Sequence, residues 1–591
     1  MYRSHTCNQL RKKDTGTKVT LAGWVKTRRD HGGLIFIDLR DRYGFTQIVS
    51  DPERFPEAHK ILEGVRSEYV LQITGVVRER PQGQYNEKVT TGEIEIVVEN
   101  TVILNESKTP PFPIDSDSSV NEEMRLKYRY LDLRGERLKH NMEMRHNVIK
   151  FIRDFLSQEE FLEIETPILI KGTPEGSREF LVPSRLHPGT FYVLPQSPQQ
   201  LKQLSMVAGL DRYFQIARCF RDEDQRGDRQ PEFTQLDMEM SFVDEEDVMS
   251  VNERLMIALC EALAKDKKLL NKPFPRMTWH EAMSRYGSDK PDIRFEMEIQ
   301  DASDIVKESG FKVFKDVVAK GGVVKMLRVP GAAAKFSRSK IDELEAKAKT
   351  YGAKGLAYIV VEEQGLKSPI LKFLSETEQK QLIEKSGAQV GDIVFFTADE
   401  FVTACTSLGN VRLACADEFN LRDPNIFAFL WVIDFPMFEW SKEDNALTAA
   451  HHPFCSIKLE DVHYLEKEPM KARAKAYDFV LNGVEVGGGS IRIHKPELQA
   501  QIFNILGISQ EDAQRRFGHM LEAFTYGAPP HGGIAWGLDR LVMIFCNEPN
   551  IREVIAFPKD QKARDLMLDA PSTIPEKQIE EMNIRVFLPK K

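Results

Sequence analysis

The first 108 residues constrain the fold most, because five apolar or alternating runs follow one another with a helix-compatible stretch between the third and the fourth. The runs are Val19–Val25, Leu34–Leu39, Thr46–Val49, Val70–Val77 and Ile94–Leu104, and the helix-compatible stretch is Pro56–Val65. Alternation of apolar and polar residues is typical of strands that bury one face. Five strands in this order predict an OB barrel, a fold that often binds single-stranded nucleic acid.

The charge of this region supports the same interpretation. The whole chain of 591 residues has a formal net charge of −9, which argues against a general polyanion binder. Residues 1–108 nevertheless hold 17 Lys/Arg against 15 Asp/Glu, so a locally basic face is available. Six arginines stand at the predicted strand ends, near Phe36 and Gln47: Arg28, Arg29, Arg40, Arg42, Arg78 and Arg80. An ordinary solvated barrel rim is the alternative.

The rest of the chain is long enough for further domains, since 591 residues at roughly 100–200 per domain give about three to five. A proline-rich and then polar stretch at 108–119 is typical of a linker. Residues 288–420 carry Lys- and Ala-rich helical patterns with few candidate catalytic clusters, which indicates an insertion. We predict a barrel (1–108), a linker (109–135), a catalytic domain in two parts (136–287 and 421–555), an insertion (288–420) and a C-terminal extension (556–591).

Several missing patterns narrow the class of protein. The seven cysteines are scattered, without a C-x-x-C pair or a Cys/His cluster, so we expect no zinc site and a reducing compartment. The sequence has no apolar signal segment and no run of 18 apolar residues, so we expect a cytoplasmic protein without a membrane span. A Walker-type phosphate loop is also missing.

Two charged segments are candidates for the chemistry. The first, residues 218–229, places arginines and acids beside predicted strands, and a buried arginine needs an anionic partner such as phosphate or carboxylate. The second holds Asp478 and Glu485 seven residues apart, then three glycines and Arg492; two carboxylates near phosphates commonly bind Mg²⁺. The alternatives are a solvated loop and a plain glycine turn. Adjacent His451 and His452 cannot easily bind one ion, so polar binding or a structural role is favoured over a metal pair.

Three motifs in order resemble the class II aminoacyl-tRNA synthetases of the aspartate branch, and among them the bacterial-type aspartyl-tRNA synthetases. Residues 161–167 (FLEIETP) resemble motif 1, residues 220–224 with 233–237 resemble motif 2, and residues 537–540 (GLDR) resemble motif 3. Residues 173–176 (TPEG), 196–199 (QSPQ) and 486–490 (VGGGS) fit the same family. The resemblance implies an α+β multidomain protein with an OB anticodon barrel, an antiparallel catalytic sheet flanked by helices, an inserted α+β domain, and a homodimer.

The implied activity is that of an aspartate–tRNA ligase, which uses ATP to make aspartyl-adenylate and then transfers aspartate to the tRNA 3′ end. Arg221 is implied as the catalytic residue, contacting the α-carboxylate and the α-phosphate. Implied for aspartate are Glu175, Ser197, Gln199, Lys202, Arg221, Asp237, His451 and Arg492. Implied for ATP are Arg221, Asp222, Glu223, Gln230, Phe233, Glu485, Gly537, Leu538, Asp539 and Arg540, and for Mg²⁺ Asp478 and Glu485. Lys202 and Arg492 would disfavour neutral asparagine, which leaves both cations uncompensated.

In the barrel, the resemblance assigns five residues to the anticodon: Arg29, Phe36, Gln47, Arg78 and Glu95. His31 and Gly83 stand at two loop positions where strict members of the family tend to carry Leu and Lys. The chain therefore resembles the relaxed type, which charges both tRNA(Asp) and tRNA(Asn) and requires an amidotransferase to convert Asp-tRNA(Asn). The alternatives are a strictly tRNA(Asp)-specific enzyme, an asparaginyl- or lysyl-tRNA synthetase, and a non-catalytic RNA-binding paralogue.

Overall fold

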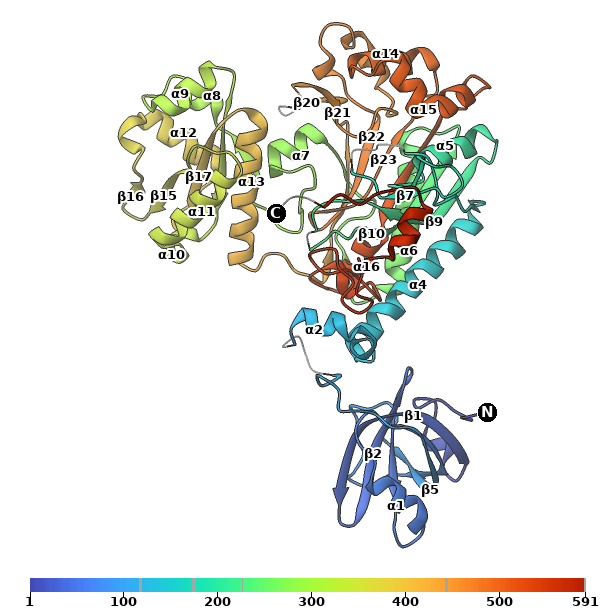
Figure 1. The fold of residues 1–591 in the computed structure, drawn as a ribbon. Coiled ribbons are helices and arrows are strands. Elements are labelled where there is room, and N and C mark those ends of the chain that lie inside the picture. Colours follow the sequence, from blue (N-terminus) through green and yellow to red (C-terminus); the bar gives the residue numbers. More distant parts are fainter. Residues whose placement is uncertain (116–119, 173–176, 226, 442–444, 589–591) are drawn as a thin grey trace. The chain divides into compact units, whose positions relative to one another are not determined.

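The computed structural model describes residues 1–115, 120–172, 177–225, 227–441 and 445–588. Contacts within the chain divide it into two compact units (Figure 1). The first comprises Met1–Glu143, Ala556–Asp560 and Arg564–Pro571, and the second comprises Met144–Ile555, Gln561–Ala563 and Ser572–Lys591. None of the helices in the described ranges is both long and apolar enough to cross a membrane.

The N-terminal barrel has the strands that the sequence predicts. β1 (Lys18–His31), β2 (Leu34–Asp41), β3 (Gly44–Ser50), β5 (Ile94–Asn105) and β4 (Val70–Glu79) close in that order, and α1 (Pro56–Glu63) lies between β3 and β4 in the chain. Alternate residues of each strand face inward, as in β1, where Val19, Leu21 and Val25 are buried. The predicted OB fold is confirmed.

Two of the six barrel arginines are structural instead of forming the expected basic face. Arg40 is 3% exposed, and its Nη2 donates to both carboxylate oxygens of Glu68 at 2.8 Å. Arg80 is also buried and donates from Nε to the carbonyl of Ile94 at 2.9 Å. Strand-end position alone does not reveal this, because the partners lie far away in the sequence. A smaller basic face therefore remains for a ligand.

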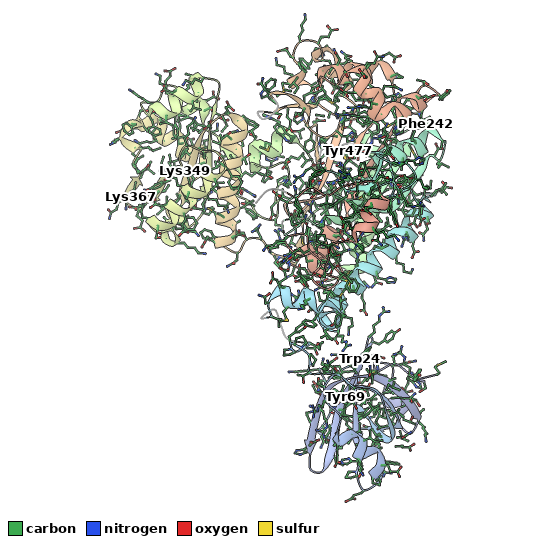
Figure 2. All side chains as sticks on the ribbon, viewed as in Figure 1. Trp24, Tyr69, Phe242, Lys349, Lys367 and Tyr477 are labelled. Atoms are coloured by element: carbon green, nitrogen blue, oxygen red, sulfur yellow. The ribbon has the colours of Figure 1, made fainter. Side chains whose placement is uncertain are left out.

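The second unit is built on an eight-stranded, mostly antiparallel sheet. Its order is β12 (Arg276–Thr278), β19 (Phe429–Ile433), β22 (Ala476–Leu481), β23 (Val484–Ile491), β24 (His531–Gly537), β10 (Glu232–Ser241), β9 (Arg212–Phe220) and β6 (Leu162–Glu163). Three helices share its main hydrophobic core: α4 (Glu136–Gln158), α6 (Glu245–Leu263) and α16 (Leu538–Phe545). Tyr477 of β22 is fully buried within this sheet (Figure 2). The predicted antiparallel sheet with flanking helices is confirmed.

A second sheet lies within residues 299–399, where the insertion is predicted. Its order is β13 (Ile299–Asp301), β14 (Val323–Val329), β17 (Ile393–Asp399), β15 (Ala357–Glu362) and β16 (Gly365–Lys367). Both faces are covered, since Phe395 packs with α11 (Arg338–Thr350) and α13 (Phe401–Glu418), whereas Phe396 packs with α9 (Lys312–Ala319) and α12 (Glu376–Ser386). The α+β character is confirmed, and the boundaries of all domains stay a prediction.

Candidate functional site

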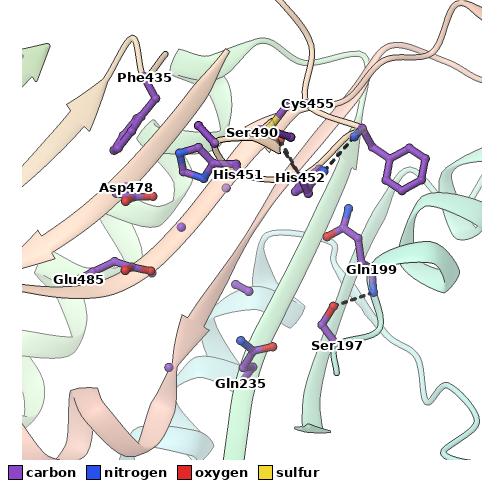
Figure 3. A pocket seen from close by; sticks show the side chains of 18 of the residues that line it. Ser197, Gln199, Gln235, Phe435, His451, His452, Cys455, Asp478, Glu485 and Ser490 are labelled. Atoms are coloured by element: carbon purple, nitrogen blue, oxygen red, sulfur yellow. Dashed lines mark hydrogen bonds between the residues drawn. The ribbon is translucent and has the colours of Figure 1, made fainter. Parts of the chain in front are cut away.

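A cavity of about 870 Å³ opens in the second unit along the central strands β10, β22, β23 and β24. Strand alternation presents every second residue of β10 to it, so Phe233, Gln235 and Asp237 line it together. α5 (Gln199–Val207) adds Gln199 and Lys202 to the lining. Figure 3 shows Ser197, Gln199 and Gln235 on one side of the cavity and Phe435, His451 and Asp478 on the other.

Most of the residues expected at the site come together in this cavity. They are Ser197, Gln199, Lys202, Arg221, Glu223, Gln230, Phe233, Asp237, His451, Asp478, Glu485, Arg492, Gly537, Asp539 and Arg540. Asp222 and Leu538 are not among the residues that line it, and the Leu538 side chain is fully buried in the core. Glu175 lies outside the described residues.

At one end of the cavity, the buried cations Lys202 and Arg492 pair with two buried carboxylates, of which Asp237 lines the cavity and Glu239 does not. Lys202 Nζ lies 3.1 Å from Asp237 Oδ1 and 3.5 Å from Glu239 Oε2. Arg492 binds Glu239 with both arms of its guanidinium, from Nε to Oε1 at 2.9 Å and from Nη2 to Oε2 at 3.1 Å. The sequence analysis missed Glu239, although its position two residues after Asp237 on a strand places both on one face.

The protonation of these groups follows from burial and charge. Burial raises the pKa of Asp237, and the nearby Lys202 opposes that shift. Burial also acts to raise the pKa of Glu239, but the charges of Arg492 and Lys202 outweigh it, so the pKa is lowered. Asp237 Oδ2 has no hydrogen-bond partner among the described residues. A buried acceptor without a partner is costly, so this oxygen is suited to a ligand that donates a hydrogen bond.

His451 and His452 have different surroundings. Burial lowers the pKa of His451 to about 4, and Asp289 opposes the shift. The His451 ring packs edge to face against Phe435, with 4.6 Å between the two ring centres. Burial and then Arg492 lower the pKa of His452 well below the ordinary value. Neutral His452 accepts a hydrogen bond from Arg492 Nη1 at 2.8 Å through Nε2, so it orients the guanidinium. This role of His452 was not predicted from the sequence.

Asp478 and Glu485 lie on the neighbouring strands β22 and β23 and project into the cavity on the side of His451 (Figure 3). A Cβ on Gly488 would stand 2.8 Å from Asp478 Oδ1 and 3.5 Å from Glu485 Oε1, so both carboxylates converge above this glycine. Burial, followed by the charges of Glu485 and Asp289, raises the pKa of Asp478 well above its ordinary value. Two like charges facing one space fit a divalent cation such as Mg²⁺.

The remaining end of the cavity is lined by arginines and an aromatic ring. Arg221 Cζ lies 5.1 Å from the centre of the Phe233 ring, and its Nε has no hydrogen-bond partner in the described part of the chain. Arg540 donates to the Glu485 carbonyl and pairs with Asp228 at 3.0 Å. A guanidinium with free donors beside a flat ring can hold a phosphate next to a base.

Asp539 has a structural task at this end of the cavity. Its Oδ2 accepts from the backbone N–H of Thr234 at 2.8 Å, and its Oδ1 accepts from Arg145. The carboxylate thereby ties α16 and α4 to β10. Asp539 also lines the cavity, so a direct contact with ATP stays a prediction.

The barrel brings together four of the five residues expected at the anticodon. Gln47 Nε2 donates to Glu95 Oε2 at 2.9 Å, and Arg78 Nε donates to Glu95 Oε1 at 3.1 Å. Arg29 Nη2 donates to Gln47 Oε1 at 3.5 Å and to Asp38 Oδ1 at 3.3 Å. Asp38 was not predicted from the sequence. The fifth, Phe36, pairs with Arg29 across β1 and β2. Together these side chains offer donors, acceptors and a ring on one face, as single-stranded RNA requires.

Comparison with known families decides where the chain belongs. A family model for tRNA synthetases class II (D, K and N) matches residues 121–561, and a model for the OB-fold nucleic acid binding domain matches residues 19–104. The chain belongs to the class II tRNA synthetases (D, K and N). The predicted family is confirmed, and an arrangement of three short motifs was sufficient to find it.

Relatives of this class II synthetase match it over nearly its full length. It is 53% identical over 586 residues to the "Aspartate--tRNA(Asp/Asn) ligase" of Caldanaerobacter subterraneus subsp. tengcongensis, covering 99% of this chain and 98% of that protein. It is 53% identical over 589 residues to the protein of the same name from a Geobacillus species, covering 100% and 99%.

Solved structures agree with the class II synthetase fold. The asparaginyl-tRNA synthetase from Pyrococcus horikoshii complexed with asparaginyl-adenylate has a TM-score of 0.59 at 19% identity, covering 94% of this chain and 98% of that chain. The aspartyl tRNA synthetase from Entamoeba histolytica has a TM-score of 0.57 at 19% identity, covering 93% and 90%. At these identities the likeness concerns the fold.

Proposed function

We propose that the chain is an aspartate–tRNA ligase that activates L-aspartate with ATP and transfers it to tRNA(Asp) and tRNA(Asn). The observation that carries the proposal is the buried cluster in which Lys202 and Arg492 face a cavity shared with Arg221 and Phe233. Relatives that are 52–53% identical over the full length bear the name Aspartate--tRNA(Asp/Asn) ligase, which supports the choice of amino acid and tRNA.

The cluster suits both charged ends of aspartate. The side-chain carboxylate accepts hydrogen bonds from Lys202 and Arg492, and the α-ammonium donates to the unpartnered Oδ2 of Asp237. Asparagine would turn amide N–H groups towards two cationic donors in a buried site, which leaves those donors unsatisfied. A site built to bind the aspartate carboxylate strongly disfavours asparagine, which lacks that carboxylate. No editing step is therefore needed against asparagine.

Activation then needs positioning and charge neutralisation instead of a protein nucleophile. An oxygen of the aspartate α-carboxylate attacks the α-phosphorus of ATP, and diphosphate leaves. Arg221 neutralises the charge that develops on the α-phosphate, Phe233 stacks on adenine, and Arg540 holds the γ-phosphate. Asp478 and Glu485 would hold Mg²⁺, which supplies further neutralisation of the phosphate oxygens when it is bound. A hydroxyl of the tRNA terminal ribose next attacks the aspartyl carbonyl, and AMP leaves.

We further propose a homodimer that buries the β6 side of the sheet. β6 is an edge strand, and exposed edges with large apolar side chains are typical of protein interfaces. Phe242, directly after β10, is 73% exposed (Figure 2). Other large apolar side chains that are exposed in this part of the sequence are Leu162, Ile168, Leu169, Leu181 and Phe191.

The chain would act in the cytoplasm with an amidotransferase that converts Asp-tRNA(Asn).

Amino-acid-dependent exchange between ATP and diphosphate tests the activation step. We expect exchange with L-aspartate and Mg²⁺, and a rate at least about a hundredfold lower with asparagine or lysine, a difference of roughly 2.7 kcal/mol. Exchange that is driven best by asparagine or lysine would assign the chain to another member of the group. No exchange with any of the three would favour a non-catalytic RNA-binding protein.

The barrel loops are expected to set the choice of tRNA. The anticodons for aspartate and asparagine differ at the third base, C against U, which exchanges an amino donor for a carbonyl acceptor. His31 ends β1 and Gly83 follows β4, and both are exposed. We expect His31→Leu with Gly83→Lys to raise the ratio of tRNA(Asp) to tRNA(Asn) charging, because a bulkier apolar group and a cation penalise the wrong pattern.

The control for this pair of substitutions separates charge from backbone strain. Gly83 has a φ of +86°, which disfavours any side chain, so Gly83→Ala introduces the strain without the cation. Gly83→Ala should leave the charging ratio unchanged, and all variants should retain wild-type exchange because activation takes place in the second unit. An unchanged ratio in the double variant would remove both residues from tRNA discrimination.

A further inference from the structure

The insertion meets the catalytic domain at a backbone-to-backbone contact. α13 passes the end of α7 (Trp279–Tyr286), as Figure 1 shows, and a glycine on each side permits the approach. A Cβ on Gly409 would stand 2.6 Å from the Tyr286 carbonyl oxygen, and one on Gly287 would stand 2.1 Å from the Cys405 carbonyl oxygen. Any shift of α13 is therefore transmitted to the end of α7.

Arg412 of α13 fixes the chain directly after that contact. It is 1% exposed and donates from Nε to the Met297 carbonyl at 2.9 Å, and from Nη2 to the carbonyls of Asp292, Phe295 and Glu296 at 3.0, 3.0 and 3.1 Å. Its Cζ lies 3.9 Å from the ring centre of Phe295 and 5.0 Å from that of Tyr286. The guanidinium thus joins α13, the end of α7 and the segment 292–297.

A charged side chain here is not required for filling the core. Burial lowers the pKa of Arg412 to about 10, so the group stays cationic at neutral pH. Within the ranges that the structure describes, no carboxylate lies within ion-pairing distance of it. An apolar residue would avoid the cost of burying this charge. The planar guanidinium, however, can donate hydrogen bonds to several carbonyls and hold them in fixed positions. Arg412 therefore serves to fix the backbone of residues 292–297, which we call the clamped segment.

α7 and the loop that follows it reach the cavity at two places. Trp279, at the start of α7, and Asp289, between the end of α7 and the clamped segment, both line it. α7 also shares a hydrophobic core with Phe435, through Ala282 and Tyr286. Phe435 in turn holds the His451 ring edge to face. A displacement of α7 would move the wall that carries His451.

We infer that Arg412 is a positioning residue for aspartate, through which the insertion holds the His451 wall of the cavity in place. The inference rests on the proposed function, together with the sequence-based expectation that His451 contacts aspartate. The residues proposed for adenine and for the α- and γ-phosphates do not belong to α7 or to residues 292–297: Arg221 directly follows β9, Phe233 lies on β10 and Arg540 on α16. The insertion is thus a part of the amino-acid site and not an appendage to it.

The test compares steady-state exchange kinetics of Arg412→Met and Arg412→Lys in the full-length chain. We expect Arg412→Met to raise the aspartate KM about tenfold and to leave the ATP KM within about twofold of wild type. A small displacement of the cavity wall that carries His451 should weaken the binding of aspartate alone. Arg412→Lys should lie between wild type and Arg412→Met, since an ammonium can still donate to some of the carbonyls. A merely structural role would lower the melting temperature without this split between the two substrates.

Arg328→Met is the matched control. Arg328 donates to Asp392 at 2.7 Å inside the insertion, and neither residue lines the cavity, so its loss should lower the melting temperature with both KM values unchanged. If Arg412→Met does not fold, Gly409→Ala replaces it, because the added Cβ forces α7 and α13 apart. An unchanged aspartate KM in the folded Arg412 or Gly409 variant, or an equal rise for ATP, overturns the inference alone. Failure of the wild-type chain to exchange with aspartate overturns the proposed function instead.

Discussion

Replacing Arg221 by alanine is expected to lower aspartate-dependent exchange by about 10²–10³, a loss of about 2.7–4 kcal/mol of transition-state stabilisation. Arg221 lies over the Phe233 ring with its Nε unpartnered among the described residues, so the guanidinium is oriented before any ligand arrives. A preorganised cation acts mainly where charge develops during the reaction, and water replaces it poorly. The rate of exchange at saturating aspartate and ATP is the measurement.

Arg218→Ala is the matched control for this variant. Arg218 lies three residues earlier on β9, pairs with Glu232 at 2.9 Å and does not line the cavity. Its loss removes a nearby but more exposed arginine that the reaction does not use, so exchange should stay close to wild type. Near-normal exchange in Arg221→Ala, together with a folded protein by circular dichroism, would remove Arg221 from the reaction.

Arg492→Leu is expected to raise the aspartate KM at least about a hundredfold and to leave the ATP KM nearly unchanged. The substitution removes one of the two cations at the aspartate end and leaves Glu239 buried with Lys202 at 3.5 Å as its remaining cation. Breaking a buried ion pair from one side typically costs about 3–5 kcal/mol, so the melting temperature should also fall. Exchange kinetics with each substrate varied separately distinguish the binding effect from the loss of stability.

Two further variants isolate the charge of Arg492. Adding Glu239→Gln to Arg492→Leu should recover part of the stability without recovering the aspartate KM, because the uncompensated carboxylate is removed while the substrate partner stays absent. Arg473→Leu breaks an arginine–carboxylate pair with Asp461 outside the cavity and should leave both KM values unchanged. Equal rises in the aspartate and ATP KM values for Arg492→Leu would place Arg492 in the scaffold.

The sequence predicted best where a local pattern and the tertiary environment agree. The barrel strands alternate apolar and polar residues because one face is buried, so their positions and order follow from the pattern. The motif residues of β10, β22 and β23 were also found, since strand alternation sends Asp237 and the Asp478–Glu485 pair towards one cavity. The neighbours in space of β10 were not predictable, because β24 lies almost 300 residues later in the chain.

The missed residues share a physical reason. Glu239, His452 and Arg412 act through partners that are distant in sequence. Arg40 shows the reverse error, since its place at a strand end favoured exposure while Glu68 buries it. Among these, Glu239 had a usable signal, because residues two apart on a strand share a face.

Charging of purified tRNAs with labelled aspartate tests the central claim most directly. The account predicts that the wild-type chain aspartylates tRNA(Asp), and that it aspartylates tRNA(Asn) with a kcat/KM within about a hundredfold of that value, a gap of roughly 2.7 kcal/mol. Asparagine and lysine should not be attached to either tRNA. Attachment of asparagine to tRNA(Asn), or no aspartate on either tRNA despite normal folding, would contradict the account.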